Sequence, residues 1–227
     1  MSVSKLSTSS QNYLKAVWSL GEWSDAPVTA STLAARVGVR LSTASDAIRK
    51  LTDQGLLEHT PYGAVALTAD GRAHAVAMVR RHRLIETFLV EVLGYRWDQV
   101  HDEAEHLEHA VSDFMVDRID EHLGHPVRDP HGDPIPARDG QVARPDAVPL
   151  AEVPPESRVR VERISDSDPD LLQFFADRGI GVGTVLRTRA GAPYSDSIGV
   201  LVGDDALALG RTAAASVWVS RPRSTSV

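Results

Sequence analysis

Apolar side chains recur at steps of three and four residues over most of the first 123 positions, a pattern that predicts amphipathic helices. From residue 157 onward the pattern changes to single alternation of apolar and polar residues between Gly-rich turns. This predicts the short strands of a small β-barrel, with one helix near 169–179. The helices predicted in the first part cover residues 10–23, 30–37, 42–54, 73–93 and 100–123.

The first 72 residues predict a winged helix-turn-helix. Two short helices are joined by a turn that contains Gly38, and the second helix is expected to begin at a cap formed by Ser42 or Thr43. Two strand-like stretches follow, at 56–59 and 65–68, with a turn between them. Helix, turn, helix and wing in this order are typical of a DNA-binding domain.

The outward surface of the second helix favours contact with DNA. It carries short hydroxyls, which can reach base edges or phosphates, and basic side chains, which neutralise phosphate. The alternative is an ordinary helical hairpin with a polar surface. The residues expected to contact DNA, including two in the wing turn, are Arg40, Ser42, Thr43, Ser45, Asp46, Arg49, Lys50, Tyr62 and Gly63.

The net charge of −7 does not exclude a nucleic-acid partner, because the charge is unevenly distributed. Residues 1–72 hold seven Lys and Arg against six Asp and Glu, so the acidic excess lies in the rest of the chain. The sequence has no Cys, no apolar run of about 18 residues, and no hydrophobic signal segment at its N-terminus. We therefore expect a cytoplasmic protein without a membrane partner.

Residues 100–123 carry a stripe of His and Glu beside the apolar stripe. The lack of Pro and Gly predicts a single helix here. In such a helix the four side chains of the stripe fall within roughly a quarter to a third of the circumference, and they are His101, Glu105, Glu108 and His109. Neighbouring Glu residues repel unless a cation lies between them, and His–Glu pairs four residues apart can share one ion. A solvated acidic surface is the alternative. With an i, i+4 pair from the preceding helix, the candidate metal ligands are His82, Glu86, His101, Glu105, Glu108 and His109.

These candidates offer nitrogen and oxygen ligands and no sulfur. Such a set favours a divalent ion of borderline-to-hard character, with Mn(II) and Fe(II) fitting best and Zn(II) also possible. The apolar surface of the helices at 73–93 and 100–123 exceeds what one small winged helix can cover. We interpret the surplus as a dimer interface, the alternative being packing within a helical second domain. Residues 125–155 hold eight of the thirteen Pro, which predicts a linker or an irregular strap.

The order of these segments carries a family resemblance. The chain places a winged helix before RRHRLIE, HDEAEHLEH, DPHGDPIP and a β-barrel, and it resembles the diphtheria-toxin-repressor family of metal-dependent transcription regulators, more closely the manganese-responsive branch. The resemblance covers nearly the whole chain. It implies a homodimer in which metal binding sets the geometry of two winged helices on palindromic operator DNA. It also implies an SH3-like C-terminal domain.

The expected fold is mainly α, with a winged helix-turn-helix at the N-terminus and an SH3-like small β-barrel at the C-terminus. The expected domains are a DNA-binding domain at 1–72, a helical dimerisation and metal-binding domain at 73–125, a Pro-rich linker at 126–156 and the barrel at 157–227.

The resemblance also assigns residues. The six candidate ligands match the family's metal-binding positions, and Glu105 stands where iron-responsive members have a sulfur residue, which favours Mn(II). Asn12 stands where the family places a Met or Asp ligand, so an amide oxygen would act there. In the barrel, Asp168 lies where members with this domain send a carboxylate to the second metal site.

The function predicted from the sequence is that of a cytoplasmic, Mn(II)-activated repressor of metal-uptake genes, with two or more metal sites per subunit. It is not expected to be an enzyme or to bind a small-molecule substrate. An Fe(II) sensor of the same architecture is one alternative, and a winged-helix regulator of an organic effector is another. A metallohydrolase is a third, although no nucleophile motif or Gly-rich phosphate loop accompanies the His and Glu cluster.

Overall fold

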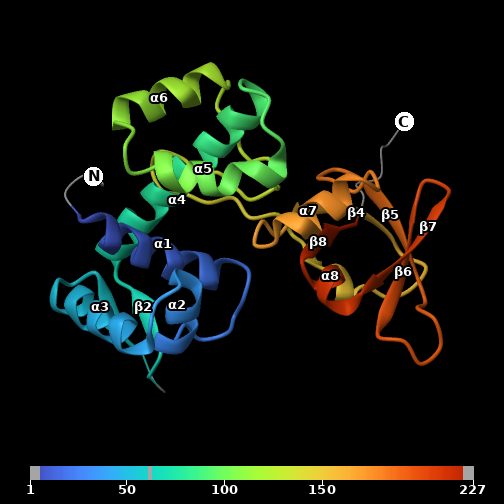
Figure 1. The fold of residues 1–227 in the computed structure, drawn as a ribbon, viewed down its shortest axis with the longest axis horizontal. Helices are drawn as coiled ribbons and strands as arrows, with labels where there is room; N and C mark the ends of the chain where they lie inside the picture. Colours follow the sequence, from blue (N-terminus) through green and yellow to red (C-terminus); the bar gives the residue numbers. More distant parts are fainter. Residues whose placement is uncertain (1–5, 61–62, 222–227) are drawn as a thin grey trace. The chain divides into compact units, whose positions relative to one another are not determined.

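The computed structural model describes residues 6–60 and 63–221 (Figure 1). The chain forms two compact units, and helix α4 contributes residues to both. Unit 1 comprises Met1–His82, His106–His122 and Pro136–Val142. Unit 2 comprises Arg83–Glu105, Leu123–Ile135 and Ala143–Val227.

Unit 1 begins with the winged helix-turn-helix, as predicted. Its elements in chain order are α1 Thr8–Glu22, α2 Ala30–Val37, α3 Leu41–Asp53, β1 Leu57–His59 and β2 Val65–Leu67 (Figure 1). The two strands pair antiparallel, with Leu57 opposite Leu67. Thr29 and Thr32 form a capping box at the start of α2, and Gly38, with a φ of 72°, ends that helix.

The predicted cap of α3 is wrong. The helix begins at Leu41 with Arg40 as its N-cap, and no side chain caps it. The turn after α2 leaves only Val39 and Arg40 before the next helix, and the Arg40 carbonyl already accepts a hydrogen bond from the Ala44 amide at 3.1 Å. The helix therefore starts before Ser42 can serve as a cap.

The core of unit 1 is formed by the apolar stripes that the periodicity predicted. Leu14 of α1, Leu33 of α2 and Leu51 of α3 are each at most 1% exposed, and they pack in one cluster with residues of the wing and of the first turns of α4. This burial fixes the outward surface of α3, since its polar residues occupy the remaining positions.

Helix α4 (Ala69–Glu91) is the longest helix of the chain as described, with 23 residues. It carries His82 and Glu86 one turn apart, as the i, i+4 spacing predicted. None of the helices within 6–60 and 63–221 combines the length and the apolar character that crossing a membrane requires.

The prediction of one helix over 100–123 is wrong. The chain forms η3 (Trp97–Gln99), α5 (Val100–Leu107) and then α6 (Asp113–His122). Between α5 and α6, the Arg81 guanidinium donates a hydrogen bond to the Glu108 carbonyl at 3.2 Å and another to the Val111 carbonyl. Ser112 then caps α6 by accepting from the Met115 amide at 3.2 Å. Arg81 and the Ser112 cap thus replace the hydrogen bonds that a continuous helix would make.

Unit 2 contains a six-stranded antiparallel sheet of order β3-β8-β4-β5-β6-β7 (Figure 1). Val161, Phe175 and Leu186 are at most 1% exposed and belong to its apolar core. The predicted helix of this region is α7, and a short helix α8 that the pattern did not predict precedes the last strand. The remaining bounds are β3 Val148–Pro149, η4 Leu150–Glu152, β4 Arg158–Ile164, α7 Pro169–Ala176, β5 Val185–Arg189, β6 Ser197–Val202, β7 Asp205–Gly210, α8 Arg211–Ala215 and β8 Val217–Ser220.

Residues 128–135, which we call the strap, lie against strand β4 within unit 2. The Ile164 amide donates to the His131 carbonyl at 2.9 Å, and Arg163 Nε donates to Asp133 Oδ1 at 2.7 Å. Gly132 has a φ of 91°, and a Cβ atom there would lie 2.1 Å from the Glu162 carbonyl oxygen. The strap is therefore an irregular but packed element, the second of the two forms expected for the Pro-rich segment.

Candidate metal centres

The first cluster, which we call the Glu108 centre, lies in unit 1. The Glu108 side chain is 0% exposed. Its Oε2 lies 2.6 Å from Nδ1 of His82, and its two oxygens lie 2.7 and 2.9 Å from the Nζ atom of Lys15. The Nε2 atom of His109 lies 3.4 Å from Oε1. Two predicted ligands, His82 of α4 and the adjacent His109, thus lie against Glu108, and Lys15 is a member of the cluster that the sequence did not reveal.

Helix α1 brings the amide side chain of Gln11 to this centre, and the residue that follows it is Asn12. Gln11 Oε1 lies 2.8 Å from Nδ1 of His109. When that nitrogen carries the ring proton and donates it to Gln11, Nε2 of the neutral ring keeps its lone pair for a metal. The Asn12 Oδ1 atom is buried and accepts no hydrogen bond from any residue that the structure describes. A buried oxygen of this kind is costly without a partner, and a cation would satisfy it.

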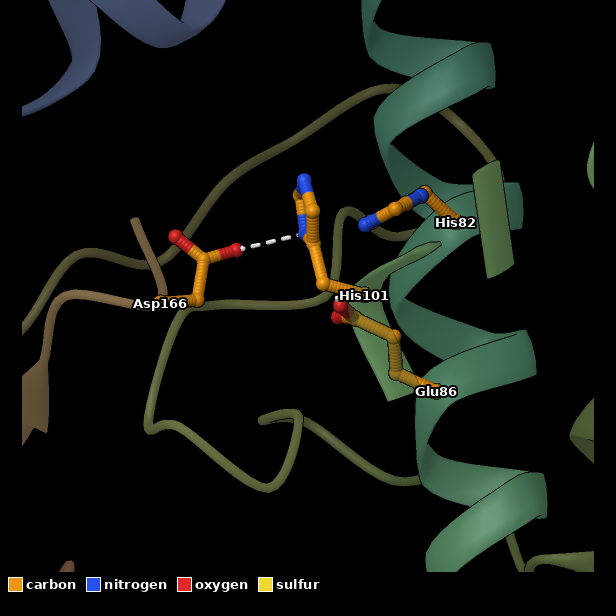
Figure 2. Close-up of side chains that lie close together, drawn as sticks. All are labelled: His82, Glu86, His101 and Asp166. Carbon is orange, nitrogen blue, oxygen red and sulfur yellow. Dashed lines mark ion pairs between the residues drawn. The ribbon is translucent and has the colours of Figure 1, made fainter. Parts of the chain in front are cut away.

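The second cluster, which we call the His101 centre, lies in unit 2. Nδ1 of His101 lies 3.0 Å from Oδ2 of Asp166 and 3.5 Å from Oε1 of Glu86. These three residues each offer one ligand atom, and the atoms lie within 4.8 Å of one another. Figure 2 shows their side chains together with that of His82, which precedes Glu86 by one turn of α4.

The His101 centre holds more negative charge than one imidazole can balance. Burial by itself would lower the pKa of the His101 ring, but hydrogen bonds with Asp166 and then Glu86 outweigh it and raise the pKa to about 10. The ring is therefore protonated at neutral pH when no metal is bound. A divalent cation would supply two positive charges, which match the two carboxylates, so the residues present fit a metal ion.

The strap adds a buried group that sequence reasoning missed. Glu86, Asp129 and His131 are all buried, and each offers a ligand atom within 4.8 Å of the others. Burial, followed by the charges of Asp133 and Glu86, raises the pKa of the Asp129 carboxyl to about 8. Burial would lower the pKa of His131, but nearby charges, led by Glu86, raise it. The Asp-x-His-x-Asp spacing of residues 129–133 is the signal that the sequence offers for this group, and the prediction of a linker or an irregular strap does not include it.

The carboxylate beside His101 belongs to Asp166, whereas the sequence pointed to Asp168. The Asp168 side chain instead caps α7, accepting from the Leu171 amide at 3.1 Å. Pro169 at the first helical position explains this role, since Pro is favoured there and the residue before it becomes the N-cap. Glu105 lies on the last turn of α5, with Oε1 3.9 Å from Nε2 of His101 and a side chain 32% exposed.

The predicted DNA-contacting residues on α3 are all exposed. Asp46 pairs with Arg49 at 2.9 Å, and the Ser45 hydroxyl donates to the Leu41 carbonyl at 2.9 Å. Gly63 is exposed with a φ of 73°, and Tyr62 lies outside the described residues. The exposed members on or next to α3 are Arg40, Ser42, Thr43, Ser45, Asp46, Arg49 and Lys50.

Comparison with known proteins gives matches over most of the chain. Residues 5–65 match the N-terminal DNA-binding domain of iron-dependent repressors, residues 68–137 match their metal-binding and dimerisation domain, and residues 148–221 match the FeoA domain. The iron-dependent repressor IdeR of Mycobacterium leprae is 33% identical over 226 residues, which cover 92% of this chain and 95% of that protein. The chain belongs to the diphtheria-toxin-repressor family.

Further relatives and solved structures are also similar to this chain over most of its length. The diphtheria toxin repressor of Corynebacterium glutamicum is 32% identical over 76% of this chain and 79% of its own. The solved structure of a manganese-dependent transcriptional repressor in complex with manganese is 52% identical, with a TM-score of 0.89 over 93% of this chain and 99% of that one. The predicted family and fold class are thereby confirmed, including the SH3-like C-terminal domain. The chain carries the DNA-binding, metal-binding and dimerisation domains of a transcriptional repressor.

Proposed function

We propose that this protein is an Mn(II)-activated repressor that binds palindromic operator DNA as a homodimer and controls genes for metal uptake. The observation that carries the proposal is the Glu108 centre, where a carboxylate with no exposed surface lies against His82 and His109. We propose further that it is not an enzyme, and that it acts in the cytoplasm, where operator DNA lies.

The choice of Mn(II) rests on the ligands and on the relatives. Both centres offer only nitrogen and oxygen atoms, which suit Mn(II) and do not select a softer ion. The 52% identical solved structure is of a manganese-dependent repressor, whereas the relatives at 32–33% identity are named for iron or diphtheria toxin. Fe(II) is therefore the second candidate, since the same ligands accept it.

We propose that the metal ligands come from both clusters. Asn12, Glu108 and His109 would serve the Glu108 centre. In the His101 centre the carboxylate from the barrel would be Asp166 in place of Asp168. His82, Glu86, His101 and Glu105 complete the proposed set.

The arrangement within unit 1 supports a switch. Asn12 lies on α1, which packs in the core of the winged helix, while Glu108 and His109 follow α5. Residues that hold one ion from both segments would fix α1 against the metal-binding and dimerisation domain. Metal binding would then favour one placement of the DNA-binding domain, which is what coupling between the two sites requires. We keep the proposed domain limits at 1–72, 73–125, 126–156 and 157–227. The matches at 5–65 and 148–221 support the first and last domains, whereas the match at 68–137 extends into the proposed linker.

The test is DNA binding with and without Mn(II), using protein purified without air and analysed for metal. The wild type should require Mn(II) to bind operator DNA. Glu108→Gln should bind operator DNA weakly, and added Mn(II) should not increase its affinity. Glu121→Gln, whose side chain is 52% exposed on α6, is the matched control and should behave as the wild type. DNA binding that is unaffected by Mn(II) would exclude the proposal, and a response to Fe(II) alone would favour the second candidate.

A further inference from the structure

Lys15 places a positive charge inside the Glu108 centre. Its Nζ atom lies 2.7 and 2.9 Å from the two oxygens of Glu108 and 3.4 Å from Nδ1 of His82, and its side chain is only 11% exposed. We propose that Lys15 is a built-in cation that competes with the metal for Glu108 and thereby sets the metal concentration at which the protein responds. The inference rests on the proposed function and extends it to a residue outside the ligand set.

The geometry makes the competition direct. The ammonium spans both oxygens of Glu108, and the His82 ring approaches Oε2 at 2.6 Å. A hard divalent ion binds carboxylate oxygen at about 2.0–2.6 Å, closer than the ammonium lies. An ion at that distance and the ammonium would be within a few ångströms of each other, where like charges repel strongly in a buried site. Metal binding to Glu108 therefore requires Lys15 to withdraw from at least one oxygen.

The same contacts give Lys15 a role when no metal is bound. A carboxylate with no exposed surface is costly without a positive partner, and Lys15 supplies one from α1. The ammonium thus does in the metal-free protein what a metal ion would do in the bound form. Each cation can neutralise Glu108. Removing the Lys15 ammonium should therefore increase the affinity of the protein for the metal ion.

The opposite role is also defined by this geometry. Lys15 could act with the metal as a second cation that holds Glu108 in place, so that its removal would weaken metal binding. The two roles predict opposite changes in the dissociation constant for Mn(II), and a measurement of that constant separates them.

The experiment measures Mn(II) binding by calorimetric titration of the full chain, together with the melting temperature of the metal-free protein. Lys15→Met should tighten the Kd for Mn(II) by about tenfold or more and lower the metal-free melting temperature, which excess Mn(II) should restore. Lys15→Gln keeps a hydrogen-bond donor without the charge and should tighten binding in the same direction, so the test stands even if the Met variant folds poorly. Lys15→Arg, which keeps the charge, should stay nearer the wild type.

The matched control is Arg118→Met, which removes a cation from a pair with Glu121 whose side chains are 65% and 52% exposed. It should change neither the Kd nor the metal-free melting temperature appreciably. An unchanged or weaker Kd in Lys15→Gln overturns the competition, while wild-type binding that Glu108→Gln abolishes would leave the proposed function standing. If the wild type binds no Mn(II) through Glu108, both the inference and the proposed function fail.

Discussion

The Nδ1 atom of His101 lies 3.0 Å from Oδ2 of Asp166, so a ring on α5 is joined to the segment that directly follows β4. The nearby Asp168 instead binds the Leu171 amide at the start of α7. Two carboxylates separated by a single residue therefore have separate roles within unit 2, one electrostatic and one in helix capping.

Substitution of each Asp by Ala should separate these roles. Asp166→Ala should weaken Mn(II) binding, because it removes a carboxylate from the His101 centre. Asp168→Ala should leave Mn(II) binding unchanged and lower the free energy of unfolding by about 0.5–2 kcal/mol, the usual contribution of an N-cap. Calorimetric titration and chemical denaturation of both variants measure the two effects. Equal loss of Mn(II) affinity in both variants would contradict the assignment.

Arg49 should contribute affinity for DNA without sequence preference. It is exposed on α3 and pairs at 2.9 Å with Asp46, which is exposed as well. Arg49→Ala should weaken binding to all sequences and reduce the slope of log K against log salt by about 0.9, as expected for the loss of one phosphate contact. Arg211→Ala, which removes an exposed cation from the barrel, is the control. A loss restricted to particular operator bases would make Arg49 a base-reading residue.

Glu162 should make the stability of unit 2 depend on pH. Burial would raise the pKa of its carboxyl, but hydrogen bonds from Ser220 and Arg128, both at 2.6 Å, outweigh burial and lower the pKa. A carboxyl whose pKa is lower in the folded state stabilises that state above its unfolded pKa, about 4.3 for Glu, and loses the effect as pH falls through the folded value.

Glu162→Gln should therefore be less stable than the wild type at pH 7 by about 1.5–3 kcal/mol, the range for hydrogen bonds to a charged group. Thermal unfolding between pH 3 and 7 should show the difference closing below about pH 4. Glu156→Gln, whose side chain is 59% exposed, should show little difference at any pH. A constant difference between wild type and Glu162→Gln across this range would contradict the role of the charge.

Gly132 should tolerate no side chain. A Cβ atom there would lie 2.1 Å from the Glu162 carbonyl oxygen, so the strap or β4 would have to move. Gly140 has a similar φ, 83°, but the nearest atom to a Cβ there would be a Val76 methyl at 3.9 Å. Gly140→Ala should thus lower the free energy of unfolding only by the backbone strain, about 1 kcal/mol. Gly132→Ala should lower it by several times more. Similar melting temperatures for the two variants would show that the strap yields easily.

The sequence was sufficient for the parts of the fold that depend on local pattern. The capping box at Thr29, the αL residue Gly38 and the alternation of the wing are local signals, and the structure contains each of them. The His and Glu stripe was predicted from a continuous helix over 100–123, which the chain does not form, because α5 ends at Leu107. His82 and Glu108 meet although the chain between α5 and α6 is not helical.

The remaining features depend on contacts between residues that are distant in the sequence. Helix α5 ends at Leu107 because Arg81 donates to carbonyls 27 and 30 residues away, and no residue near Leu107 in the sequence indicates this helix end. Lys15 reaches Glu108 across 93 positions. Asp166 and Asp168 differ in role because Pro169 sets the start of α7 and makes Asp168 its N-cap, which is a local signal in the sequence.

The contacts of the strap bear on how the barrel can be studied. Arg83 donates to the Pro134 carbonyl at 2.7 Å and lies 3.4 Å from Asp133, which accepts from Arg163 of β4. A chain shortened to end before β4 would leave Asp133, only 4% exposed in the intact protein, without the Arg163 guanidinium. Loss of a metal response in such a chain would reflect a damaged fold as much as a lost ligand. The barrel is therefore not a detachable appendage, and its role is better tested one side chain at a time.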